Sequence, residues 1–192
     1  MSYSLNEYES LALKATRGAG LPWGLAEDAG KAVRILSSFG FESGSLLLEI
    51  LENQQNTSAL LIGAHFCDSL NHFSGLEFLE PVQSPGLLIA FIALSVSETD
   101  KCAYCKWSNF EIYVTSQDLF IVSATGFNVT TASPIWIGLA EAPQGKKREK
   151  SNRAMLSKDT YNKLIALASK TYAPATEESR IAGAGAGLND ND

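Results

Sequence analysis

The stretch KATRGAGLPWGLAEDAGK, residues 14–31, decides how the N-terminal part of the chain folds. It holds Gly18, Gly20, Pro22 and Gly24 in close succession, between two segments with helical spacing of apolar residues. Glycine loses more conformational freedom on folding than any other residue, so such a stretch is retained where the backbone shape matters. We therefore expect a hinge that joins two helices into an αα-hairpin or a helix-turn-helix-like corner.

The segments on either side of this hinge carry helix signals of their own. Ser4 and Glu7 have the spacing of a capping box, and Gly18 is a natural stop for the helix that follows it. The second helix has an apolar stripe over residues 25–36 and ends at Gly40. A short third helix is expected directly after Ser45.

The rest of the chain changes character. Residues 110–114 and 119–122 are rich in β-branched and aromatic side chains and predict a hairpin, and residues 135–139 predict another strand. The apolar run 87–96 fits a buried strand or a buried helix, because periodicity cannot separate the two. Ser157 is the expected cap of a last helix. These patterns divide the chain into a helical part (4–52), a sheet-rich middle (59–140), a basic connector (141–153), and a C-terminal helix and tail (157–192).

Length and composition indicate a single α+β domain. The chain has 192 residues, 45% of them apolar and 19% charged, which is enough to bury one core. We expect a mostly antiparallel central sheet with helices from both chain ends packed on it.

Charge and hydropathy exclude some classes of function. The net charge of −6 argues against a nucleic-acid partner, and the basic cluster within residues 146–153 has no interleaved aromatic residue, so we interpret it as solvated. The longest apolar run, residues 87–94, is too short to cross a bilayer. The N-terminus has neither a basic segment nor an apolar run, so we expect a cytoplasmic protein without a membrane partner.

The two ends of the chain resemble a bacterial family of unknown function. The resemblance is carried by Leu5-Asn-Glu7, by residues 14–27 and on to Ala32, and by residues 174–187 and 190–192, where the rare residues match in order. It implies that the hinge and the Gly-Ala-rich tail belong to one fold. It implies no catalytic residue.

The hinge is the candidate site. A helix that begins near Pro22 points free backbone N–H groups forward, Gly18 and Gly20 permit close approach, and Arg17 and Trp23 stand beside them. This arrangement predicts a pocket for a small anion, with Arg17 as the fork and Trp23 as the wall. The competing interpretation is a packed corner, with Trp23 in the core and Arg17 paired with an acid. Aromatic residues beside glycines usually serve packing, which favours the corner.

Two acids complicate the anion pocket. Glu27 and Asp28 fall in the expected first turn of the second helix, where the helix dipole already favours negative charge. Unless they point away, they occupy the field that a bound anion would use.

The Gly-Ala tail suggests an alternative. If it folds back over the hinge, Arg180 flanks the same cleft as Arg17, and Glu27 and Lys31 add ionisable groups. Two classes of function follow: a module that binds a small anion or a protein partner, and a small enzyme with a dispersed site. A flat apolar face near Trp23 would instead indicate a protein partner or a homo-oligomer.

Three cysteines and two histidines leave a metal site open. Cys102 and Cys105 are spaced as Cys-x-x-Cys, and Cys67 lies between His65 and His72, so a tetrahedral zinc site is one interpretation. The simpler interpretation is that these cysteines and histidines are ordinary small residues of the core or of loops. No phosphate-binding or dinucleotide motif is present, and we expect neither metal nor cofactor.

Overall fold

A computed structural model of the chain describes residues 2–68 and 75–172. The helices are α1 (Leu5–Gly18), α2 (Trp23–Ser38), α3 (Gly44–Glu52), α4 (Ala59–Asp68), α5 (Leu88–Val96) and α6 (Lys158–Ser169), with a 3₁₀ turn, η1, at Pro85–Leu87. The strands are β1 (Ser2–Ser4), β2 (Leu76–Phe78), β3 (Val82–Gln83), β4 (Cys102–Trp107), β5 (Phe110–Val114), β6 (Leu119–Ala124), β7 (Thr131–Ala132), β8 (Ile135–Ala140), β9 (Lys146–Lys147) and β10 (Arg153–Met155).

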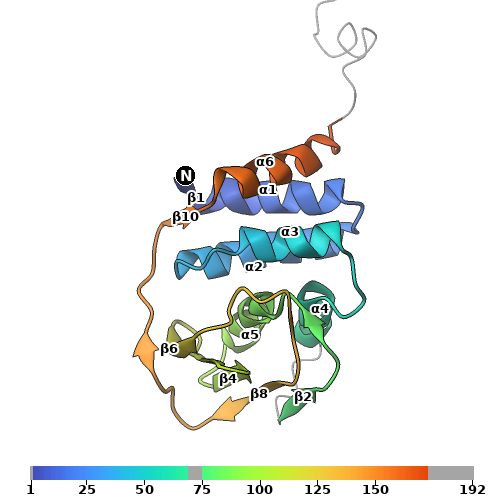
Figure 1. The fold of residues 1–192 in the computed structure, drawn as a ribbon. Helices are drawn as coiled ribbons and strands as arrows, with labels where there is room; N and C mark the ends of the chain where they lie inside the picture. The colour runs from blue at the N-terminus through green and yellow to red at the C-terminus, as the bar shows by residue number, and fades with distance from the viewer. Residues whose placement is uncertain (1, 69–74, 173–192) are drawn as a thin grey trace, which may run out of the picture.

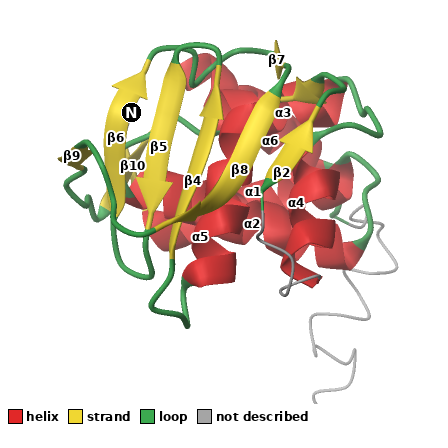
Figure 2. Ribbon diagram, turned by 90° about the horizontal axis from the view of Figure 1, so that it is seen from below, coloured by secondary structure: helices red, strands yellow, loops and turns green. Residues whose placement is uncertain are grey.

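The main sheet is antiparallel and has the strand order β2-β8-β4-β5-β6-β9. Helices pack behind it, and among the described residues no helix covers its other face (Figure 2). Ala103, Cys105 and Trp107 alternate along β4 toward the buried side, where α5 lies. Two short ribbons, β1 with β10 and β3 with β7, complete the strands.

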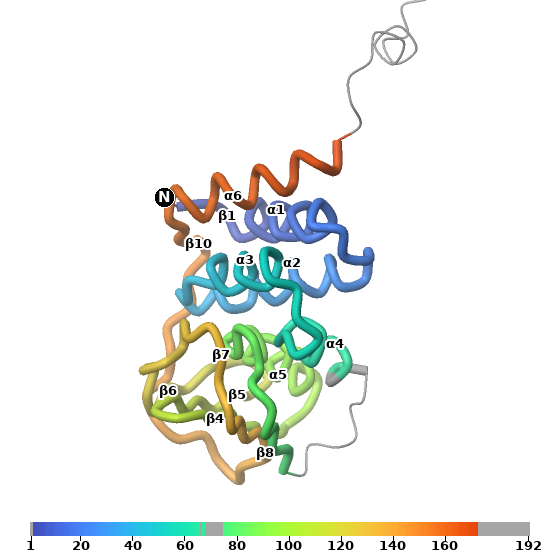
Figure 3. Tube along the Cα trace, turned by 45° about the vertical axis from the view of Figure 1, so that its right-hand side comes forward, coloured from blue at the N-terminus to red at the C-terminus, as the bar shows by residue number. Residues whose placement is uncertain are grey.

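The elements are stacked in layers (Figures 1 and 3). Helices α4 and α5 lie next to the sheet, α2 and α3 lie on them, and α1 and α6 form the outermost layer. One apolar core runs through the stack from Tyr8 in α1 to Ile112 in β5. The α+β class and the antiparallel sheet are confirmed. The helices from the two chain ends, α1 and α6, connect to the sheet through the packing of α2 and α5, which lie between them and the sheet.

The expected helix hairpin is present, but its glycines have different roles from those expected. The capping box is formed, because Glu7 N donates to Ser4 Oγ (3.1 Å) and Ser4 N donates to Glu7 Oε2 (2.8 Å). Helix α1 continues through Gly18, and the residue with a left-handed backbone is Gly20 (φ +92°). At Gly18 a side chain is excluded for another reason: a Cβ would lie 1.8 Å from Leu167 O of α6.

Several other boundaries differ from the expectations. Residues 88–96, ambiguous by sequence, form helix α5, and the range 59–140 also holds α4. Helix α3 begins at Gly44 rather than after Ser45, and the buried Ser43 hydroxyl before it donates to Val33 O (3.2 Å). The predicted hairpin and the strand after it are β5, β6 and β8.

The basic connector is exposed along most of its length, as expected, but two of its cations also contact the rest of the fold. Arg148 donates to Phe39 O (2.7 Å) and Gly40 O (3.2 Å), while its guanidinium group lies 5.1 Å from the centre of the Phe41 ring. Lys147 forms an ion pair with Asp118 (2.7 Å). These contacts tie the connector to the end of α2 and to the β5–β6 turn, so its cations serve the fold.

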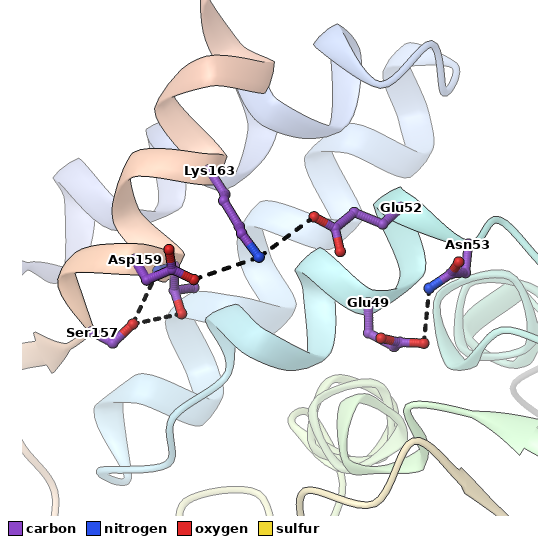
Figure 4. Close-up of polar contacts among 7 residues, drawn as sticks. Glu49, Glu52, Asn53, Ser157, Asp159 and Lys163 are labelled. Atoms are coloured by element: carbon purple, nitrogen blue, oxygen red, sulfur yellow. Dashed lines mark hydrogen bonds and ion pairs between the residues drawn. The ribbon is translucent and has the colours of Figure 1, made fainter.

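Helix α6 is fixed at its start and along its side. Ser157 caps it as predicted, accepting a hydrogen bond from Thr160 N (3.0 Å). Lys163 Nζ lies 3.5 Å from Asp159 and 4.0 Å from Glu52 of α3 (Figure 4). Ion pairs this exposed are worth at most about 1 kcal/mol, so the packing of α6 on α1 does more to hold it.

Within residues 2–68 and 75–172, no helix has the length and apolar character needed to cross a membrane.

Replacing Gly18 with alanine should destabilise the protein. The new Cβ would meet a backbone carbonyl that can move only if α6 moves, and overpacking of this kind costs about 1–3 kcal/mol. Urea unfolding followed by circular dichroism measures the loss. Gly24→Ala is the matched control, because nothing lies within 4 Å of its Cβ position in α2. Equal midpoints for the two variants would contradict the close contact of α1 with α6.

Candidate functional site

A pocket of about 490 Å³ lies where α1 and α6 end and α2 begins. Its described lining contains three cationic and two aromatic side chains. The lining residues are Leu13, Lys14, Arg17, Gly18, Trp23, Lys170, Thr171 and Tyr172. The pocket therefore brings the hinge together with the C-terminal end of α6, about 150 residues further along the chain.

The backbone of the hinge holds the guanidinium group of Arg17 near the Trp23 ring, which forms one wall of the pocket. Arg17 Nη1 donates to Leu21 O (2.6 Å), and the guanidinium carbon lies 5.6 Å from the centre of the Trp23 ring. The bond to Leu21 uses one of the five guanidinium N–H donors, and the others have no acceptor within the part of the chain that the structure describes. Arg17 is thus positioned by the loop and still has donors for a ligand.

Trp23 does not fill the core. Its side chain is 59% exposed, and its indole Nε1 donates to Glu27 Oε1 (2.7 Å). The packed-corner interpretation is therefore wrong for this residue. Arg17 does not pair with Glu27 either, since the indole holds that carboxylate.

Helix α2 begins next to Pro22, as expected, but the two acids lie further along it than expected. Its first residue is Trp23, its cap is Pro22, and no side chain caps its free N–H groups. Glu27 and Asp28 consequently lie in the second turn rather than the first. The Glu27 carboxylate nevertheless reaches back to the start of α2, because it accepts the hydrogen bond from the Trp23 indole, so an anion in the pocket would depend on the cations that line it more than on the helix start.

The charge of the pocket is positive. Lys14, Arg17 and Lys170 line it, and none of its described lining residues is acidic. The C-terminal ends of α1 and α6 contribute roughly −0.5 elementary charge each, and the start of α2 roughly +0.5. Three cationic side chains outweigh that sum, so the pocket favours an anion.

The three cations differ in how they are held. Lys14 Nζ is 3.3 Å from Tyr172 Oη and 5.5 Å from the centre of its ring. Lys170, at the end of α6, has no hydrogen-bond or ion-pair partner for its ammonium group among the described residues. An anion in the pocket would therefore meet three different groups. They are the guanidinium group of Arg17, which the loop holds in place, the ammonium group of Lys14, which lies on the Tyr172 ring, and the ammonium group of Lys170, which has no partner among the described residues.

The structure brings only some of the predicted site residues together. Arg17, Gly18 and Trp23 line the pocket. Gly20 shapes the loop without lining it, and Lys31 is exposed two turns further along α2. Arg180 and the whole Gly-Ala tail lie outside the described residues.

Sequence reasoning missed Lys14, Lys170 and Tyr172. Lys14 could have been predicted from the sequence, because it precedes Arg17 by three residues and this spacing places both side chains on one face of a helix. No local signal places the other two, since they reach the pocket only through the packing of α6 on α1.

The cysteines do not form a cluster. Cys102 and Cys105 are three residues apart on strand β4, so they lie on opposite faces of the sheet and cannot share one metal ion. Cys67, on α4, contacts Phe91 O and Ser95 Oγ, each at 3.6 Å. His72 lies outside the described residues, within which no group of three metal-ligating side chains is found.

Comparison with known proteins gives one partial match. Residues 3–71 match a family model described as a protein of unknown function (DUF3726). The match covers α1 to α4 and the hinge, and it supports a likeness to a family without an assigned activity; residues 174–192 lie outside it. No curated protein and no solved structure matches the chain.

Cys105 should resist alkylation in the folded protein. Its thiol is fully buried, and burial raises its pKa well above the ordinary value, so little thiolate forms at pH 8. Iodoacetamide labelling followed by mass spectrometry of peptides should find Cys105 unmodified in the native protein and modified in urea. Labelling at equal rates in both conditions would place Cys105 outside the core.

Proposed function

We propose that the protein binds a small organic anion in the pocket formed by the hinge and the end of α6. The observation that carries this proposal is the convergence of Lys14, Arg17 and Lys170 on one hollow whose described lining holds no carboxylate. Like charges in one pocket repel each other, and a bound anion relieves that repulsion. A carboxylate or phosphate group also fits the planar fork of Arg17.

The remaining basic residues support a small ligand rather than a nucleic acid. The connector uses Lys147 and Arg148 for contacts with Asp118 and with the end of α2. Lys150 lies 5.4 Å from the centre of the Phe39 ring, and Arg153 donates to Ser2 O (2.8 Å). With these cations engaged, the connector offers little unpaired positive charge, whereas three cations line the hinge pocket, which is the size of a metabolite site.

Two other functions were open from the sequence. A protein partner or a second copy would need a flat apolar face near Trp23, but Arg17 and Glu27 flank that indole on either side. An enzyme with a dispersed site would also use Arg180, which lies outside the described residues, so this alternative stays a prediction. The lining of the pocket supports binding of an anion. We also propose a cytoplasmic location, with which three cysteines that form no disulfide with one another agree.

Binding should be visible as thermal stabilisation by anions. A ligand at a hundred times its Kd stabilises by about 2.7 kcal/mol, so a screen of phosphate, acetate, dicarboxylates and nucleotides should give a concentration-dependent rise in Tm for at least one class. Lys14→Met and Lys170→Met should each weaken binding about tenfold or more, because a hydrogen bond to a charged group is worth about 1.5–3 kcal/mol.

Lys101→Met is the matched control. It removes the same charge from an exposed lysine directly before β4, a strand that lies at the opposite end of the layers from α1 and α6 (Figure 1). Its binding should equal that of the unmodified protein. A screen with no response, or equal losses in all three variants, would refute the proposed anion pocket.

A further inference from the structure

A second hollow adjoins the cationic pocket and follows the groove between α1 and α6. Its volume is about 580 Å³, and Lys14 and Tyr172 line both hollows. Its other sides are mainly apolar or aromatic: Tyr3, Tyr8, Leu11, Tyr161, Ile165 and Ala168. We call it the α1–α6 groove.

The residues that form the groove follow helical spacing on both sides. Leu11 and Lys14 lie on one face of α1, three residues apart. On α6, Tyr161, Ile165 and Ala168 lie on one face and lead to Tyr172 beyond the helix end. The eight steps of helical rise from Tyr161 to Ser169, where α6 ends, correspond to about 12 Å.

The floor of the groove is apolar, and its far end combines tyrosine rings with the polar side chains of Asn6 and Glu7. Leu11 and Ala168 are buried, whereas Ile165 is 43% exposed and Tyr172 is 63% exposed along the open side. At the end away from the cations, the rings of Tyr3 and Tyr161 stack with centroids 4.5 Å apart and an interplanar angle of 11°. The groove thus has stacked tyrosine rings and the Glu7 carboxylate at one end and opens into positive charge at the other, an order of charge that places an anionic head at the lysine end.

We infer that the ligand is a single-chain amphiphilic anion, a carboxylate or phosphate head with an apolar tail. This inference rests on the proposed anion pocket and adds a substrate class to it. The head would meet Lys14, Arg17 and Lys170, and the tail would lie over Leu11 and Ile165 toward the tyrosine pair. The order of charge and apolar surface along the groove selects this occupant over a small dianion or an uncharged apolar molecule.

Affinity should rise with the length of the tail. A fully buried methylene adds about fourfold and a half-buried one about twofold, so octanoate should bind at least tenfold more tightly than acetate. Isothermal titration of the full-length protein, below the concentration at which octanoate forms micelles, measures this ratio. Octylamine has the same tail with a positive head, and it should bind at least tenfold more weakly than octanoate.

Substitutions at the rim of the groove test its location. Ser169→Trp and Ser10→Trp each place a large ring in the groove from an exposed position, one from each helix. Both should abolish the advantage of octanoate and leave the binding of acetate or phosphate unchanged. Asn162→Trp is the matched control, because Asn162 is exposed on α6 and does not line the groove.

The outcomes separate the two proposals. If phosphate or acetate binds but octanoate has no advantage, the inference on the tail is overturned and the anion pocket stands. If octylamine binds as tightly as octanoate, the pocket does not select an anionic head and the inference is overturned. If Ser169→Trp and Ser10→Trp leave the binding of octanoate unaffected, the tail does not lie in the groove and the inference is overturned as well. Sedimentation with anionic phospholipid vesicles, without binding of monomeric octanoate, would assign the apolar preference to a membrane surface and also overturn the inference. If no anion binds, both the proposed anion pocket and the inference on the amphiphilic ligand are refuted.

Discussion

The close contact of α6 with Gly18 is the constraint on which the outer half of the molecule depends. Leu167 O occupies the space that any side chain at Gly18 would need, at 1.8 Å from the Cβ position. Because the two backbones can touch there, α1 and α6 end at the same place. That common end brings Lys170 and Tyr172 to Lys14 and forms both the cationic pocket and the groove that leads from it.

The distribution of positive charge follows from the same packing. In an acidic chain most basic side chains have a structural use: Arg148 binds the carbonyls at the end of α2, and Lys147 binds Asp118. The hinge is different, because three cations gather there with few partners among the described residues. The proposed anion would supply negative charge to this pocket.

The sequence predicted elements whose signals are local. The capping box at Ser4, the cap at Ser157 and the β5–β6 hairpin depend on residues a few positions apart, and all three are present. Strand β4 was missed, although Ala103, Cys105 and Trp107 alternate toward the core, because one short alternation is a weak signal. The apolar run in α5 is buried over most of its surface, so it has no polar face from which a helical period could be recognised.

The sequence by itself determined that a hinge with a special backbone joins two helices and that Arg17 and Trp23 belong to it. Only the tertiary structure decided what the hinge glycines serve, where Trp23 points and which cations share the pocket. The physical reason is the range of the interactions. Caps, turns and helix faces depend on neighbours in the chain, whereas the contact of Gly18 with Leu167 joins residues far apart in it, and their meeting is set by how the layers pack.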